Sequence, residues 1–254
     1  MPIKMIVTDL DGTLLRTDKT ISEHTASVFN RCRDKGIIVV YATARAIRGV
    51  TMLNLDIRND AAIYHNGAVI AIADHAHHHI GIDPKTTKTL LLQAAKRFRE
   101  MRMSVEINDV LYSNYDVTRT WANTHAIPTD FTNLPDIPAD KIIFTTAESD
   151  AVRELTSMLP DDLYSDISEN RILMVMNKNA RKRNAVARIA EHYGISFSEI
   201  VAFGDDFNDI EMLRDFGVGV AMANAIDEAK AVADYVCDTN DNDGVAKWLD
   251  ENVL

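Results

Sequence analysis

Two carboxylates, Asp9 and Asp11, follow the apolar run 3–8 and lie two residues apart in Asp-Leu-Asp-Gly-Thr. In a parallel sheet, residues just past the carboxyl end of a strand face the ligand crevice, so both acids would project there. Two neighbouring acids can take different catalytic roles: one stays ionised and acts as the nucleophile, and the other carries a proton. Gly12 permits a sharp turn that brings backbone amides near an anion. The competing interpretation is an ordinary Asp-x-Asp-Gly surface turn.

A second acidic stretch, Gly-Asp-Asp-Phe-Asn-Asp over 204–209, follows the apolar run 200–203. Asp205 and Asp209 are oxygen donors four residues apart and can face one point where a strand becomes a helix, an arrangement that suits Mg²⁺. Asn208 or Asp209 could instead only cap the following helix. Four acids at neighbouring strand ends would repel one another without a cation, so a divalent metal is the economical inference.

Three further polar residues lie at the same predicted edge. Thr43 ends the run 37–42 and offers a hydroxyl donor, with Arg45 beside it. Lys182 opens a late helical segment and offers a cation. Two of them have an ordinary alternative: Thr43 as a cap residue, and Lys182 as part of a solvated basic cluster.

The elements that must position these residues alternate between strand and helix. Apolar runs predict strands at 3–8, 37–42, 61–64, 68–73, 200–203 and 218–222. Helical patterns cover about 22–35, begin near 44, extend from 182 to 193, and follow 208. Asn66-Gly67 between two apolar runs predicts a hairpin. This rhythm predicts an α/β fold, a Rossmann-like doubly wound parallel sheet made from both ends of the chain.

The middle of the chain has a different pattern. It predicts helices at about 86–101 and 148–159, strands at 104–107, 110–113, 141–145, 163–167 and 171–176, and a loop over 124–139. We therefore expect residues 1–81 and 179–254 to form the core, and 82–178 to form an inserted α+β domain.

These motifs, in this order, resemble those of the haloacid dehalogenase-like phosphohydrolases, specifically the Cof-type group with a C2B-type α/β cap. The nucleophile motif would be 9–13, the second motif Thr43-Ala44-Arg45, the third-motif lysine Lys182, and the fourth motif 204–209. Asn66-Gly67-Ala68 and the trailing segments 218–225 and 243–246 also match. The resemblance covers nearly the whole chain.

The resemblance implies a role for each matched residue. Asp9 would attack phosphorus, and Asp11 would protonate the leaving oxygen and then activate water. Mg²⁺ would be held by Asp9, the backbone carbonyl of Asp11 and Asp205, with Asp209 supporting them. Thr43 and Lys182 would bind phosphoryl oxygens and Asn208 would orient nearby groups; the remaining candidate substrate-binding residues are Gly12, Ala44, Arg45 and Asn66.

Two residues depart from the family pattern: Ala44 replaces the usual glycine, and Arg183 follows the motif lysine where a small residue is common. Dehalogenation is disfavoured, because that chemistry has no use for a second aspartate. The insert would select the leaving group, with Asp109, Tyr112 and His125 as candidates beside an ordinary surface or core role. The His-rich tract 75–79 is expected to be exposed and outside the site.

Composition limits the partners. A formal charge of −11 disfavours a broad nucleic-acid surface, which works through lysine and arginine. No apolar stretch is long enough for a membrane span, and residues 1–7 do not resemble a signal peptide. Two cysteines without metal-ligand spacing suggest neither a disulfide framework nor zinc, so a reducing cytoplasm is the expected location. The expected oligomeric state is a monomer or a homodimer.

The sequence therefore predicts a Mg²⁺-dependent phosphoric monoester hydrolase that acts on a small phosphorylated metabolite, by default a sugar phosphate, through an aspartyl-phosphate. Two alternatives stay open. One is a phosphomutase, which returns the phosphoryl group to sugar, and the other is a non-catalytic regulator that binds a phosphometabolite.

Overall fold

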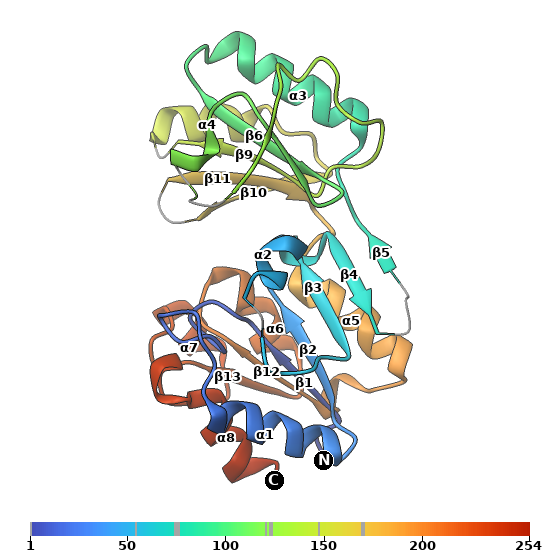
Figure 1. Cartoon of the computed structure of the whole chain (residues 1–254), viewed down its shortest axis with the longest axis vertical. Helices are drawn as coiled ribbons and strands as arrows, with labels where there is room; N and C mark the ends of the chain where they lie inside the picture. Colours follow the sequence, from blue (N-terminus) through green and yellow to red (C-terminus); the bar gives the residue numbers. More distant parts are fainter. Residues whose placement is uncertain are drawn as a thin grey trace. The chain divides into compact units, whose positions relative to one another are not determined.

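The computed structural model describes residues 2–53, 55–73, 77–119, 121, 124–146, 148–168 and 171–254. The chain divides into two compact units, 1–78 with 181–254 (unit 1) and 79–180 (unit 2) (Figure 1). Among the described residues, no helix is long and apolar enough to cross a membrane. Both cysteines are free thiols, and Cys32 is buried.

Unit 1 is built on a sheet with the strand order β14-β13-β12-β1-β2-β3-β4-β5. Its strands are β1 (Met5–Thr8), β2 (Ile38–Ala42), β3 (Ala61–Tyr64), β4 (Val69–Ile72), β5 (His77–His79), β12 (Ile200–Gly204), β13 (Val218–Ala221) and β14 (Tyr235–Val236). Pairing is parallel from β14 through β3, and β4 runs antiparallel to β3 as the far arm of the predicted hairpin.

Helices cover both faces of this sheet, because its central strands are apolar on both sides. The helices of unit 1 are α1 (Glu23–Asp34), α2 (Ile47–Thr51), α5 (Lys182–Tyr193), α6 (Ile210–Asp215), α7 (Asp227–Val232) and α8 (Gly244–Asn252). Ile6 of β1 belongs to one core cluster with residues of α1 and α8, whereas Val7 belongs to a second cluster with residues of α5. The predicted α/β doubly wound fold is confirmed.

Unit 2 has its own six-stranded sheet with the order β10-β11-β9-β6-β7-β8. Its strands are β6 (Arg102–Ile107), β7 (Val110–Ser113), β8 (Ile127–Pro128), β9 (Lys141–Thr145), β10 (Leu163–Ser168) and β11 (Ile172–Asn177). The two helices, α3 (Pro84–Arg97) and α4 (Ser149–Ser157), contribute Leu91 and Leu155 to one cluster with the inward residues of β6 and β9. The assignment of this unit as a cap stays a prediction.

Some predicted boundaries were wrong for identifiable reasons. The helix expected near Ala44 begins at Ile47, because the hairpin turn takes the preceding carbonyls: Asn66 N–H donates to Thr43 O and His65 N–H to Arg45 O. Helix α3 begins earlier than predicted, since Asp83 caps it by accepting from Thr86 N. The predicted loop 124–139 contains the short strand β8. In the His-rich tract, His77, His78 and His79 are exposed as expected, and His75 lies outside the described residues.

Candidate active site

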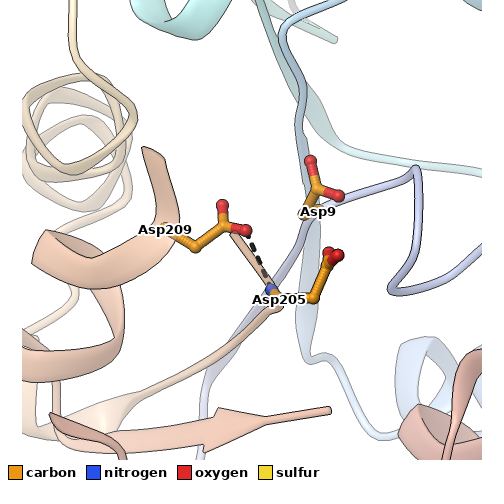
Figure 2. A group of neighbouring side chains, drawn as sticks. All are labelled: Asp9, Asp205 and Asp209. Carbon is orange, nitrogen blue, oxygen red and sulfur yellow. Dashed lines mark hydrogen bonds between the residues drawn. The ribbon is translucent and has the colours of Figure 1, made fainter. Parts of the chain in front are cut away.

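Two neighbouring parallel strands bring the predicted acids to one edge of the sheet. Strands β1 and β12 pair with Thr8 opposite Phe203, and Asp9 N–H donates to Phe203 O at 3.0 Å. Asp9 and Asp205 therefore leave the sheet side by side at its carboxyl edge. Figure 2 shows their carboxylates together with that of Asp209, and one oxygen of each lies within 4.8 Å of the others.

Asp209 is fully buried, and both of its oxygens are engaged. Its Oδ2 accepts from the backbone N–H groups of Asp205 at 2.9 Å (Figure 2) and Asp206 at 3.1 Å. Its Oδ1 accepts from Lys182 at 2.7 Å. A side chain at Gly204 would collide with Asp209, so the glycine makes room for it. Asp209 therefore has little remaining capacity to bind a metal ion and supports the other two acids instead. Asp9 and Asp205 have more lone pairs available as ligands than Asp209 has.

Lys182 is the first residue of α5, and its side chain is completely buried. Its Nζ donates to Asp9 Oδ1 at 2.6 Å and to Asp209 Oδ1 at 2.7 Å. Burial alone would lower the pKa of Lys182, but Asp209 and Asp9 outweigh it and raise that pKa, so the ammonium stays charged. Gly67 helps to place this helix start, since a side chain there would lie 2.6 Å from Arg181 O.

The three carboxylates carry more negative charge than one lysine offsets. Burial raises the pKa of Asp9 well above its ordinary value, and the nearby Asp209 and Asp205 add to that rise against the opposing effect of Lys182. Burial also raises the pKa of Asp205 to about 7, although the Thr13 hydroxyl donates to its Oδ1 at 2.6 Å. Such a group of acids is stable as carboxylates only with a further cation. Oxygen donors of this kind suit a hard divalent ion.

Asp11 lies outside this acidic group. Its carboxylate accepts from Arg45 Nη2 at 2.7 Å and Nε, and from Lys19 Nζ at 2.7 Å. Burial would raise the pKa of Asp11, but the hydrogen bonds from Arg45 and Lys19 outweigh it and lower that pKa. As a metal ligand, Asp11 would therefore offer its backbone carbonyl, as the family resemblance implies.

The remaining predicted residues form one linked group beside β2. Thr43 is buried, and its hydroxyl accepts from Arg45 N at 3.1 Å while Asn66 N–H donates to Thr43 O at 3.0 Å. Asn208 Nδ2 donates to Asn66 Oδ1 at 2.9 Å. The hydrogen bond between Asn208 and Asn66 thus joins the fourth motif to the hairpin turn. Ala44 lies between Thr43 and Arg45, and the hydrogen bonds that Thr43 accepts from Arg45 N and Asn66 N are present beside it. Arg183, the other departure, pairs with Asp215 at 3.0 Å.

Sequence reasoning missed Thr13, Lys19 and Gly67 as parts of the site. Thr13 belongs to the first motif, so its position next to Asp11 and Gly12 was an available signal. Lys19 contacts Asp11, and Gly67 lies against the backbone of Arg181. The local sequence pattern predicts neither contact.

In unit 2, the three predicted specificity residues lie in different places. His125 is exposed and lines a pocket of about 760 Å³, formed by residues 113–118, 124–126 and 128–130. Asp109 lies in the turn between β6 and β7, and Tyr112 is half-buried on β7; neither lines this pocket.

The fold and the site define a class of protein. The chain matches the haloacid dehalogenase-like hydrolases over residues 6–249 and belongs to that family. Its pattern is that of the Cof-type group, and it is a phosphatase.

Three relatives illustrate the similarity. The chain is 30% identical over 268 residues to the 5-amino-6-(5-phospho-D-ribitylamino)uracil phosphatase YitU of Bacillus subtilis, covering 97% of this chain and 96% of that protein. It is 28% identical over 258 residues to YcsE, a phosphatase of the same name from that organism, covering 99% and 96%. The solved structure of the superfamily phosphatase BT1666 from Bacteroides thetaiotaomicron has a TM-score of 0.88 and 26% identity, over 100% of this chain and 96% of that one.

Proposed function

We propose that the protein is a Mg²⁺-dependent phosphatase that hydrolyses a small phosphorylated metabolite through an aspartyl-phosphate at Asp9. The observation that carries this proposal is the group of Asp9, Asp205 and Asp209 at the carboxyl edge of the sheet, in which Asp9 and Asp209 are buried and bonded to the buried Lys182 and Asp205 is half-buried. Phosphoryl transfer needs mainly fixed charges and donors placed around the transferred group, and this group supplies them.

The residues present fit a Mg²⁺ ion. Asp9 and Asp205 would hold it with the backbone carbonyl of Asp11, while Asp209 is already fixed by two amides and Lys182. Burial and the neighbouring acids raise the pKa values of Asp9 and Asp205, so a cation held between these two carboxylates would favour their ionised forms. When bound, the ion would offset charge on the phosphoryl group and help to align it with Asp9.

The chain's own groups would then carry two displacements. In the first, an Asp9 carboxylate oxygen forms a bond to phosphorus, the ester P–O bond breaks, and Asp11 gives a proton to the leaving oxygen; Asp11 would take up this proton in the substrate complex, because its pKa in the free protein is lowered. In the second, water attacks the phosphoryl-aspartate, Asp11 takes the proton from that water, and the bond between phosphorus and Asp9 breaks to release phosphate. Lys182 and Thr43 would hold phosphoryl oxygens through both steps.

The proposed substrate class is a sugar phosphate or a similar phosphorylated polyol. Two relatives are named for a substrate that carries a phosphorylated ribityl chain, which is an alkyl phosphate of this kind. An alkoxide leaving group needs protonation, and Asp11 supplies the acid for it. Unit 2 would select the alcohol part of the ester, with His125 and the pocket it lines as the first place to test. A cytoplasmic location completes the proposal, and it is consistent with the two free thiols.

The test compares Asp9→Asn with Asp34→Asn, a control at an exposed position of α1. Phosphate release from 4-nitrophenyl phosphate and from a panel of sugar phosphates would be measured with and without Mg²⁺. We expect Mg²⁺-dependent release by the wild-type and control proteins, and none by Asp9→Asn with the fold intact. Substantial hydrolysis by Asp9→Asn would refute the role of Asp9.

Product analysis separates the alternatives. Free phosphate supports the phosphatase, whereas an isomerised sugar phosphate without free phosphate indicates the phosphomutase. Tight binding without turnover across the panel indicates the regulator.

A further inference from the structure

Lys19 lies on the loop that follows the first motif and contacts Asp11 directly. Its Nζ is 2.7 Å from Asp11 Oδ1, although the side chain is 47% exposed. The backbone at Lys19 has φ of 67°, a left-handed conformation that costs a non-glycine residue about 1–2 kcal/mol. An exposed lysine ion pair contributes only about 0–1 kcal/mol, so stability alone does not account for this arrangement.

A turn near the C-terminus of the chain holds the loop in place. Arg16 Nη2 donates to both carboxylate oxygens of Asp243 at 3.0 Å each. Thr17 donates through its backbone N–H and its hydroxyl to the two oxygens of Asp241, at 2.7 Å each. Asn240 Nδ2 donates to Leu15 O at 2.9 Å in a buried position. These contacts fix the backbone on the N-terminal side of Lys19. The position of the loop therefore determines that the Lys19 side chain can contact Asp11.

The donors around Asp11 are distributed unequally between its two oxygens. Among the described residues, Oδ1 accepts from Lys19 Nζ and Arg45 Nη2, and Oδ2 accepts from Arg45 Nε. A carboxylate offers about four lone-pair sites, two on each oxygen. Oδ2 therefore keeps the larger free capacity, and the two cations prevent the carboxylate from rotating to exchange its oxygens.

We propose that Lys19 is a positioning residue for the phosphatase reaction: it fixes the orientation of the Asp11 carboxylate, and the turn 240–243 acts through Lys19. This inference rests on the proposed acid and base role of Asp11. Lys19 itself does not touch the reacting atoms. Its removal leaves Arg45 bonded to both oxygens of Asp11 but takes away the third donor, so the carboxylate is held less tightly.

The test uses the full-length protein with saturating Mg²⁺ and two substrates, 4-nitrophenyl phosphate and a sugar phosphate whose leaving group needs an acid. We expect Lys19→Met to lower kcat by about tenfold to a hundredfold, the range of a small misplacement of a catalytic group, with KM changed less than twofold. Lys19→Arg should recover kcat to within about threefold, because it restores a cation of similar reach. Lys4→Met is the matched control: Lys4 is 54% exposed and pairs with Glu199 at 2.6 Å, just before the amino end of β1.

Two double variants distinguish positioning from a structural effect. In an Asp11→Asn background, Lys19→Met should cause no further loss of the residual turnover, which 4-nitrophenyl phosphate keeps measurable because its leaving group needs no acid. Asp241→Ala should lower kcat, and it should cause no additional loss when combined with Lys19→Met.

The proposal is overturned if Lys19→Met raises KM at unchanged kcat, since Lys19 would then bind substrate. It is also overturned if Lys19→Met is as costly in the Asp11→Asn background as in the wild type, or if Lys19→Met behaves like Lys4→Met. The proposed function has a separate failure: Asp9→Asn and Asp11→Asn would both retain full activity.

Discussion

Replacing Lys182 by methionine tests how the buried charges of unit 1 are balanced. The variant keeps the length of the side chain but removes the ammonium that bonds Asp9 and Asp209 at 2.6 and 2.7 Å. It leaves three carboxylates with oxygens within 4.8 Å of one another. Without a metal ion, those groups must stay charged and repel, or take up protons.

The expected cost follows from the burial of this lysine, whose side chain is 0% exposed. A charge-assisted hydrogen bond contributes about 1.5–3 kcal/mol, and removal of one partner of a buried ion pair costs about 3–5 kcal/mol. We take about 3–5 kcal/mol for the variant, because the carboxylates can relieve part of the repulsion by protonation. For a chain of 254 residues, that free energy corresponds to a fall in Tm of roughly 6–20 °C. Turnover should fall at least about a hundredfold, as expected for the loss of one group that stabilises developing charge.

The assay is thermal unfolding followed by far-UV circular dichroism at pH 8 and pH 5, each with and without Mg²⁺. The loss in Tm should be largest at pH 8 without Mg²⁺, since the carboxylates are then most charged. It should shrink at pH 5 and in Mg²⁺, because protons or a divalent cation replace the missing charge; activity should not return. Lys4→Met is again the control. Two results would contradict this account of the charge balance. In one, Lys182→Met unfolds at the wild-type Tm without Mg²⁺; in the other, Mg²⁺ leaves the fall in Tm unchanged.

Two further outcomes test the metal site. The pKa of about 7 for Asp205 lies above its unfolded value, so the metal-free folded protein binds more protons than the unfolded chain; its stability should therefore fall as pH rises from about 4 to 7. The apparent Mg²⁺ affinity should rise about tenfold per pH unit over the lower part of that window, where Asp205 is mostly protonated, and level off as the pH passes about 7; Mg²⁺-induced shifts in Tm would measure it. Gly12→Ala should destabilise the fold by about 1–2 kcal/mol, because Gly12 has φ of 81°, and it should raise the Mg²⁺ concentration for half-maximal activity, because the new methyl group would collide with Asp205. Unchanged Mg²⁺ dependence in that variant would contradict the placement of Asp205 at the metal.

The features that sequence predicted best depend on local rules. Helix α5 extends from Lys182 to Tyr193 as expected and ends where Gly194 adopts φ of 64°. The apolar runs that became β1 and β12 were sufficient to predict that Asp9 and Asp205 would leave the sheet at the same edge, because parallel neighbours end together.

Features that depend on distant contacts were not predictable in the same way. A cluster of three basic residues is usually solvated; the position of Lys182 at the start of its helix favoured it as the cation of the site, but the local pattern does not show that its side chain is completely buried. The contact of Lys19 with Asp11 depends on a loop held by Asp241 and Asp243, which lie more than two hundred positions further along the chain. Short-range periodicity carries no information about such pairs.

The two kinds of acid in this site have different surroundings, and the difference matches the chemistry proposed for them. Asp209 is fully buried and has both oxygens engaged, so it cannot move without breaking several contacts. Asp11 has a side chain that is 37% exposed, and it is held by cations on loops instead of by the sheet. A buried ion pair rarely stabilises a fold more than apolar residues of the same volume, so the fixed group has its best explanation in ligand binding. Asp11 must reach the leaving oxygen and the attacking water in turn, and its partly exposed carboxylate permits both contacts.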